Sequence, residues 1–397
     1  MNQSIPLIGG KAVIVIESEE DKLSYTAPLH HGNQIQFYAC LHSKASMCNV
    51  ATEIFRELQR SNHRICLHNY FQTFGWADPG LLPYQGIDRQ APIGLFLGLP
   101  TQVPEFFFKH EFRIGCFVCE STLIPEAWVY FCNRMDLIVV PSNFCASAFK
   151  ASGVTAPIMV VPHGLEPEFK PYADKQRGDK LVFFNTFYST SLCHRKSLVE
   201  LVRSFQRAFE GRRDVILRLR TDQSDALENC RQKYPFGDLV ELDLMSDSLP
   251  LEDYARIFSE VHCTVHPSKG EGFGLVPFQS IACETPVLAP HATGMADYLD
   301  VNNSLNIKTG EPVAGEGVGN AVGTYYSIDE DHLVEQLRYM ADNWEAEYQK
   351  VRQVSSGFRQ RYSWTAALAG FAQTVDALLA LNSIAERQSL VQKHCSN

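Results

Sequence analysis

The chain has little of what a membrane protein or a nucleic-acid-binding protein needs. Lysine and arginine number 35 against 45 aspartate and glutamate, which gives a formal net charge of -10. This acidic balance argues against nucleic-acid binding. Apolar runs such as 137–140 have the length of a strand, and none reaches that of a membrane span. Residues 1–10 lack a basic segment followed by a long apolar run, so we expect no signal peptide.

The 12 cysteines do not form a metal-binding pattern. The one Cys-x-x-Cys pair, Cys116 and Cys119, has no second pair that would complete a zinc site. It lies in an apolar run that is typical of a strand, where alternation would place the two thiols on opposite faces. We therefore interpret these cysteines as small core residues rather than as a redox pair. The sequence favours a reduced, cytoplasmic protein.

The sequence does contain alternating predicted strands and helices, and this alternation occurs in two successive halves. Residues 11–17 form a β-branched run, 47–58 carry apolar residues at helical spacing, and 64–68 are again apolar. Such alternation predicts parallel sheets. The rhythm restarts at Leu181, after a segment at 162–167 whose proline and glycine residues suit a linker. A length of 397 residues fits two domains of ordinary size.

The stretch 266–294 carries the strongest functional signal. A short apolar strand precedes it, and apolar residues at helical spacing predict a helix from Leu275. The turn between strand and helix holds three alternating glycines, which are Gly270, Gly272 and Gly274. Glycines let the backbone approach a ligand closely, and a helix start directs N–H groups and partial positive charge at it. A phosphate-bearing ligand fits this turn, where Glu271 can accept hydrogen bonds from sugar hydroxyls.

Glu271-Gly-Phe-Gly-Leu, followed by Ala282-Cys-Glu-Thr-Pro-Val-Leu-Ala289, resembles the donor-site signature of retaining, family-4-type nucleotide-sugar glycosyltransferases of the GT-B fold. That signature has two glutamates separated by seven residues; Glu271 matches the first, and Gln279 stands at the second. The resemblance implies that Glu271 reaches the transferred sugar and that position 279 holds the nucleotide ribose. Glutamine keeps hydrogen-bonding groups but lacks the charge that strengthens such bonds, so ribose recognition is expected to depart from the family pattern.

The resemblance also implies the architecture, which is two doubly wound, Rossmann-like α/β domains facing a cleft. Residues 1–163 would form the acceptor-side domain and 164–363 the domain that binds the nucleotide sugar. A helix at 364–382 would cross back to the first domain, and 383–397 are expected to be a frayed polar tail. Segments around Cys119–Pro171 match the family's hinge region.

Further site residues follow from the same resemblance. The donor contacts implied besides Glu271 and Gln279 are Gly272, Phe273, Gly274, Leu275, Val276 and Gly294. Glu120 directly follows a predicted strand and faces the expected cleft, where it would either orient the acceptor or line the hinge. His163 stands where asparagine is commoner in the family, and we interpret it as a hinge residue before a ligand contact.

Arg195 and Lys196 are the expected cations of the site. They follow a predicted strand and loop in the second half, and the family often has an Arg-Lys-Gly pattern there, with Ser197 standing in place of the glycine. Cleavage of a nucleotide sugar builds negative charge on the leaving diphosphate, which cations must stabilise. Arginine offers a planar fork and lysine a point charge. Two cations at a helix start are unfavourable locally, which strengthens a functional interpretation.

We expect neither a metal nor another cofactor. The acidic run 329–331 has the carboxylates that a metal would need, but its place before a late helix is typical of a cap. The sequence thus favours a glycosyltransferase that moves a sugar from a UDP- or GDP-linked donor to a glycan, lipid-linked or small-molecule acceptor, with peripheral membrane contact left open. Two alternatives remain at this point: a non-catalytic GT-B-like protein that binds a nucleotide sugar or a partner, and another GT-B reaction such as phosphorolysis or epimerisation.

Overall fold

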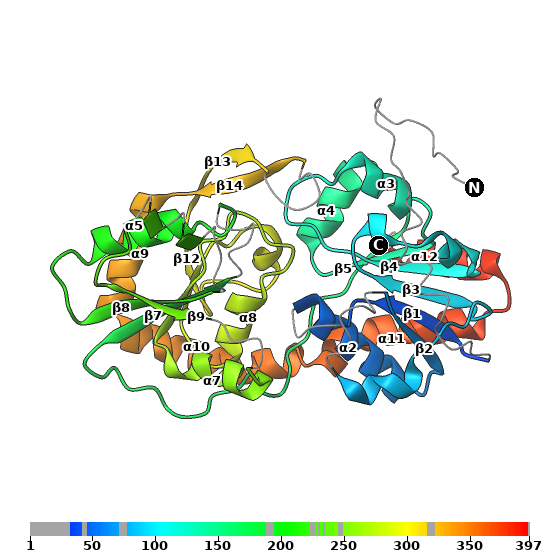
Figure 1. Ribbon diagram of the computed structural model, residues 1–397, viewed down its shortest axis with the longest axis horizontal. Helices are drawn as coiled ribbons and strands as arrows, with labels where there is room; N and C mark the ends of the chain where they lie inside the picture. The colour runs from blue at the N-terminus through cyan, green and yellow to red at the C-terminus, as the bar shows by residue number, and fades with distance from the viewer. Residues whose placement is uncertain are drawn as a thin grey trace.

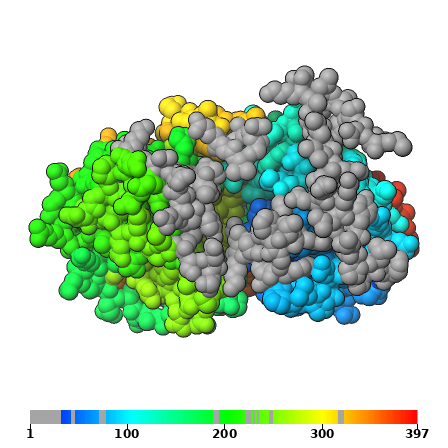
Figure 2. Space-filling view, in the orientation of Figure 1, coloured from blue at the N-terminus to red at the C-terminus, as the bar shows by residue number. Residues whose placement is uncertain are grey.

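The computed structural model describes residues 32–41, 46–70, 78–187, 194–221, 227–228, 231–232, 235–244, 249–315 and 322–395. The strand expected at 11–17 lies outside these residues. Two α/β domains lie side by side along the long axis of the molecule (Figure 1). The space-filling view shows them as two lobes that meet near the centre of the face in view (Figure 2).

The N-terminal domain is built on a parallel sheet, with six described strands in the order β2-β1-β3-β4-β5-β6. The strands are β1 (Ile35–Ala39), β2 (Ile65–Asn69), β3 (Ile93–Leu97), β4 (Phe112–Cys116), β5 (Leu137–Val140) and β6 (Ile158–Val160). The connecting helices are α2 (Ser46–Arg60), η3 (Pro79–Tyr84), η4 (Pro100–Gln102), η5 (Glu105–Lys109), α3 (Glu126–Cys132) and α4 (Asn143–Ala151). Ser142 caps α4, as its sequence position predicts, because its Oγ accepts a hydrogen bond from the Cys145 N–H at 3.2 Å.

The C-terminal domain repeats the architecture, with the described strands in the order β12-β11-β10-β7-β8-β9. They are β7 (Leu181–Phe187), β8 (Val215–Thr221), β9 (Val240–Leu244), β10 (Cys263–Val265), β11 (Val287–Ala289) and β12 (Leu305–Asn306), all parallel. A separate antiparallel hairpin joins β13 (Thr309–Ala314) and β14 (Thr324–Ile328). The helices are α5 (Leu198–Ala208), α7 (Leu251–Glu260), α8 (Leu275–Ala282), η6 (Thr293–Asp297), α9 (Glu330–Asp342) and α10 (Trp344–Arg361).

The end of the chain returns to the first domain, as expected for the GT-B fold. Helix α11 (Trp364–Ala380) packs against α2, and Thr365 donates a hydrogen bond to Glu57 at 3.0 Å. The hydrophobic cores divide accordingly: Val161 and Trp364 belong to the N-terminal core, whereas Leu165 and Tyr362 belong to the C-terminal core. The chain therefore passes between the domains twice within a short distance, and Leu165 pairs with Tyr362 through a backbone hydrogen bond of 2.7 Å.

Two parts of the fold differ from the sequence-based expectation. Strand β1 was not predicted, because Gln36 interrupts its apolar pattern; the structure buries this side chain and its amide donates to the Cys66 carbonyl at 3.1 Å. The expected frayed tail is instead helix α12 (Ile384–Cys395). Arg387 holds it in place by donating to the Leu378 and Leu381 carbonyls and to Glu111, each at 2.9–3.0 Å. Among the described residues, no helix is long and apolar enough to cross a membrane.

Candidate functional site

The glycine-rich loop runs from the end of β10 to the start of α8 and lies against the N-terminal domain. A Cβ on Gly270 would come within 2.3 Å of the Glu120 carbonyl, and one on Gly272 within 2.2 Å of Val118. A Cβ on Gly294 would lie 2.2 Å from the Gly272 carbonyl oxygen. These glycines are therefore required by close packing, both inside the loop and across the domain boundary.

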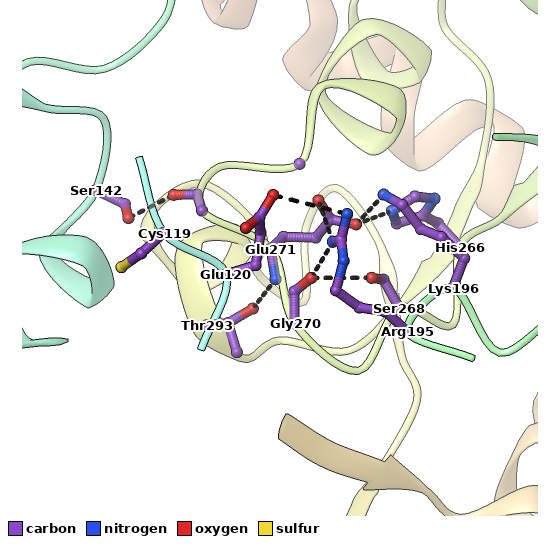
Figure 3. A network of polar contacts seen from close by, with 12 residues as sticks. Cys119, Glu120, Ser142, Arg195, Lys196, His266, Ser268, Gly270, Glu271 and Thr293 are labelled. Atoms are coloured by element: carbon purple, nitrogen blue, oxygen red, sulfur yellow. Dashed lines mark hydrogen bonds and ion pairs between the residues drawn. The ribbon is translucent and has the colours of Figure 1, made fainter. Parts of the chain in front are cut away.

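Glu271 lies at the centre of a buried group of charges (Figure 3). Its Oε1 accepts a hydrogen bond from the Lys196 ammonium, and its Oε2 lies 3.4 Å from Nη1 of Arg195. The same Arg195 nitrogen donates to the Gly270 carbonyl. The backbone holds the group together, since Lys269 N–H donates to the Arg195 carbonyl at 2.9 Å. The structure thus brings together Glu271, Arg195 and Lys196, the three residues that the sequence places in catalytic roles.

The electrostatics of this group favour an ionised carboxylate. Burial alone would raise the pKa of Glu271, but the charges of Lys196 and Arg195 outweigh it and hold the pKa well below its usual range. Burial lowers the pKa of Lys196, and the Glu271 carboxylate opposes this shift. Because a buried ion pair is costly unless well compensated, the carboxylate and the two cations depend on one another.

His266, the last residue before the loop, is a contact of Glu271 that the sequence analysis did not single out. Its Nε2 lies 2.9 Å from Glu271 Oε1. Burial lowers the pKa of His266, which favours the neutral ring, although the Glu271 carboxylate opposes this shift. An ionised carboxylate can only accept a hydrogen bond. We therefore assign the proton to Nε2, which donates to Glu271. A histidine at a strand end five residues before the glutamate was the available signal, but a lone histidine in an apolar run is weak evidence.

The two cations precede α5 in a tight turn. Ser197 ends this turn with a φ of 55°, in the left-handed region that favours glycine. This conformation gives a physical reason for the glycine that the family often has at this position. The Ser197 hydroxyl is buried and has no hydrogen-bond partner among the described residues. Nearby, Lys269 and Glu200 form a second buried ion pair at 2.6 Å, which ties the glycine-rich loop to the first turn of α5.

The N-terminal domain contributes polar contacts to the site across the domain boundary. Ser142 Oγ donates to the Gly272 carbonyl at 2.6 Å (Figure 3). Glu120, whose side chain is 45% exposed, lies 3.7 Å from Arg195 Nη2. Asn143 donates to Asp297 through both its backbone N–H, at 2.8 Å, and its side-chain amide, at 3.1 Å. The site therefore includes side chains from both domains. Of the N-terminal side chains in these contacts, the sequence analysis named only Glu120 as a site residue.

The predicted donor residues of α8 lie at a helix start that no side chain of the described residues caps. Gly274 precedes the helix with a φ of 92°, and Leu275 and Val276 form its first turn. Their N–H groups and the positive end of the helix dipole are suited to an anion. Gln279 is buried one turn further along. Phe273 instead packs inward against Phe278 and Tyr298, at ring-centroid distances of 4.9 and 5.3 Å.

The remaining predicted residues have structural contacts. His163 lies between Phe273 and Trp364, with ring centroids at 4.8 and 6.3 Å, and burial lowers its pKa to about 4. This position, beside the start of α11, fits the predicted hinge role. The Gly294 N–H donates to the Glu271 carbonyl oxygen at 2.9 Å, so this hydrogen bond holds the backbone of the glycine-rich loop in place at Glu271.

The acidic run at 329–331 caps α9, as the sequence analysis proposed. Asp329 accepts from the His332 N–H at 3.0 Å, and Glu330 and Asp331 pair with Arg203 and Arg207 of α5. Within the parts of the chain that the structure covers, no group of three or more histidine, cysteine, aspartate or glutamate side chains could hold a metal ion.

The family model described as "Family 4 Glycosyltransferase in conflict systems" matches residues 154–371, which is more than half of the chain. The chain belongs to this family. The match includes the whole C-terminal sheet, the cations Arg195 and Lys196, the glycine-rich loop and the start of the returning helix α11.

Solved structures of glycosyltransferases share the fold of this family-4 protein. HepE from Anabaena, in complex with UDP and glucose, matches with a TM-score of 0.66 and 12% identity over 87% of this chain and 100% of that chain. Sucrose-phosphate synthase from Thermosynechococcus elongatus matches with a TM-score of 0.62 and 14% identity over 87% and 99%. The lipopolysaccharide outer core galactosyltransferase WaaB, in its apo form, matches with a TM-score of 0.60 and 14% identity over 85% and 97%. A search of curated protein sequences finds no significant match.

Proposed function

We propose that this family-4 protein transfers a sugar from a nucleotide-diphosphate sugar to an acceptor hydroxyl, with retention of the anomeric configuration and without a metal. The observation that carries the proposal is the buried group of Arg195, Lys196 and Glu271, placed beside the uncapped start of α8. Two cations and a helix start suit a diphosphate, and a carboxylate beside them suits a sugar hydroxyl.

In the proposed reaction, the bond between the anomeric carbon and the diphosphate oxygen breaks, and negative charge grows on the departing phosphate. Arg195, Lys196 and the first N–H groups of α8 would stabilise that charge. Glu271, oriented by His266, would hold the sugar. In a retaining reaction of this type, the departing phosphate oxygen takes the proton of the acceptor hydroxyl, and a new bond forms on the face that the phosphate leaves.

The acceptor would bind from the side of the N-terminal domain. Glu120 lies across the boundary from Arg195 and is partly exposed, so it can accept a hydrogen bond from an acceptor hydroxyl. A glycan, a lipid-linked sugar or a small polyol carries such hydroxyls. HepE was solved with UDP, with UDP and glucose, and with UDP-glucose, which makes UDP-linked donors the first to test, followed by GDP-linked ones.

A panel of nucleotides and nucleotide sugars in a thermal-shift assay, with and without EDTA, tests the donor site. A ligand that binds only the native state raises the melting temperature. We expect stabilisation by one base type, unaffected by EDTA, and lost in Arg195→Ala/Lys196→Ala. The matched control is Arg203→Ala/Arg207→Ala, which removes two exposed cations from the same helix region and should keep the response. Stabilisation that survives loss of Arg195 and Lys196 would place the donor elsewhere. NMR of the product's anomeric proton then tests retention.

Gln279 favours a second candidate, a protein that binds a nucleotide sugar without transferring it. In that case a nucleotide sugar would stabilise the protein, while prolonged incubation with acceptors would give neither transfer nor hydrolysis. Gln279→Glu, which restores the family's charge, would then be expected to tighten nucleotide binding and to produce transfer. If the unchanged protein already transfers sugar, this second candidate is excluded.

A further inference from the structure

Two thiols meet at the end of β1 in the N-terminal domain. Cys40 directly follows β1, and Cys48 lies in the first turn of α2. Their sulfur atoms are 3.4 Å apart, so the two side chains already point toward each other. Cys40 is partly accessible and Cys48 is buried beneath it. Among the cysteines that the structure describes, Cys395 is the only other one that is not buried.

This thiol pair lies on the side of the domain where ligands bind in such folds. Strand β1 lies between β2 and β3 in the sheet, and Tyr70 directly follows β2. The Tyr70 hydroxyl donates to the Leu97 carbonyl at the end of β3, at 3.4 Å. Burial raises the pKa of Tyr70, and the nearby thiols of Cys40 and Cys48 raise it further. The pair thus lies at the carboxyl ends of neighbouring parallel strands, the edge at which open α/β sheets bind ligands.

Figure 1 shows α2, in dark blue, beginning on the side of the N-terminal domain that faces the C-terminal domain. Cys48 is the third residue of this helix. The first turn of a helix stabilises negative charge, and the thiolate is the reactive form of cysteine. Cys48 is therefore suited to attack an oxidised partner, while the more accessible Cys40 is suited to meet the oxidant first.

We propose that Cys40 and Cys48 form a reversible oxidation site, at which a peroxide converts the two thiols into a disulfide that ties the end of β1 to the start of α2. The Cys40 thiolate attacks one peroxide oxygen, the O–O bond breaks, and the departing hydroxide or alkoxide takes up the proton that the Cys40 thiol released. The products are a sulfenic acid and one molecule of water or alcohol. The Cys48 sulfur then attacks the Cys40 sulfur, the S–O bond breaks, and the departing hydroxide takes up the Cys48 thiol proton and leaves as water. The two sulfurs are oxidised by two electrons in total, and the peroxide is reduced.

The geometry needs little change for this step. A disulfide bond is about 2.05 Å long, so the sulfurs must approach by about 1.4 Å. The new bond would link the end of β1 to the first turn of α2 on the expected acceptor side, and we expect it to change the rate of sugar transfer by at least twofold. Only this consequence for sugar transfer rests on the proposed function; formation of the disulfide does not.

The experiment uses the full-length protein, treated with increasing hydrogen peroxide, then alkylated and digested without reductant for mass spectrometry. We expect a peptide pair cross-linked between Cys40 and Cys48, with a mass two hydrogen atoms below the sum of the two reduced peptides. The cross-link should form before any change at the buried Cys119 and Cys145. A dithiol reductant should reverse it. Cys40→Ser and Cys48→Ser should each abolish the cross-link. Cys119→Ser, a buried thiol elsewhere at the domain boundary, is the control that should retain it.

Two outcomes would overturn the inference. The disulfide site is wrong if peroxide oxidises Cys40 to sulfinic acid or couples it to other cysteines without the Cys40–Cys48 link. The regulatory consequence is wrong if the link forms quantitatively and the rate of transfer, or nucleotide-sugar turnover, changes less than twofold. If the protein shows no transferase activity, the peptide mapping still decides whether the disulfide forms, so the two proposals fail separately.

Discussion

Replacing Glu271 by glutamine should abolish sugar transfer and, at the same time, tighten the binding of UDP. The reason is that the Glu271 carboxylate already pairs with Arg195 and Lys196, the two cations that a diphosphate would need. It accepts a hydrogen bond from Lys196 and lies 3.4 Å from Arg195. In this state the carboxylate competes with an incoming phosphate, and a neutral glutamine would compete less.

The size of the effect follows from the charges. At 3.4 Å and an effective dielectric constant of about 20, the attraction between Arg195 and Glu271 is about 5 kcal/mol. A diphosphate recovers only part of this energy, because it loses its own hydration on binding and the glutamine amide still accepts a hydrogen bond. A recovery of about 1.4 kcal/mol corresponds to a Kd about tenfold lower. Removing one partner from a buried charge group is costly, so the variant should also lose about 3 kcal/mol of stability without UDP.

Isothermal titration calorimetry with UDP measures the first effect, and product formation measures the second. Circular dichroism before titration shows whether the variant is folded. Glu120→Gln is the matched control, because this carboxylate also faces Arg195 but is 45% exposed and 3.7 Å away; solvent-exposed pairs contribute less than about 1 kcal/mol. A folded Glu271→Gln protein that binds UDP with unchanged or weaker affinity would refute the idea that the carboxylate and the phosphate compete.

Three further substitutions test other parts of the structure. Gly294→Ala should cost about 1–3 kcal/mol in urea unfolding, because its Cβ would meet the Gly272 carbonyl at 2.2 Å; Gly357→Ala, in open space on α10, should be neutral or stabilising instead. Ser197→Gly should gain about 0.5–1 kcal/mol in the same assay, since relief of about 1–2 kcal/mol of left-handed strain exceeds the entropy that glycine adds to the unfolded chain; a less stable variant would contradict this account. Burial raises the pKa of Glu166 from 4.5 to about 7, above its unfolded value, so its contribution to stability is present below pH 4.5 and lost as the pH rises through 7. Glu166→Gln should therefore match the wild type at pH 4 and exceed it by about 3 kcal/mol at pH 8, measured by thermal unfolding at both values.

The charge group at Glu271 could be predicted from the sequence because it depends on local chain geometry. The glycine-rich turn places Glu271 at the end of β10, and Arg195 and Lys196 follow β7. These two strands are neighbours in the sheet, so the segments that follow them meet at one edge. The doubly wound architecture that the family resemblance implies places the carboxyl ends of the parallel strands at one edge, which brings a carboxylate and two cations together.

The contacts across the domain boundary could not be predicted in the same way. Ser142 was recognised as a helix cap, which its local sequence determines, but its donation to the Gly272 carbonyl depends on how two separately folded domains meet. Strand β1 and helix α12 were missed for a related reason. Gln36 and Arg387 are polar residues whose burial is acceptable only because groups far away in the sequence accept their hydrogen bonds: the Cys66 carbonyl for Gln36 and the Glu111 carboxylate for Arg387. A local pattern contains no information about such partners.

The two departures from the family signature, Ser197 and Gln279, differ in what they change. Ser197 alters backbone strain, and the two cations directly before it still reach Glu271. Gln279 removes a charge from α8 at the position expected to hold the ribose. Neither removes the two cations. Within the described residues Arg195 and Lys196 share one buried carboxylate, Glu271, and the second carboxylate near them, Glu120, is half-exposed. A buried cation that only a solvent-exposed carboxylate balances is poorly compensated. Under the proposed function we therefore expect an anionic ligand to bind here, and we expect Gln279 to change the affinity for the nucleotide rather than to abolish its binding.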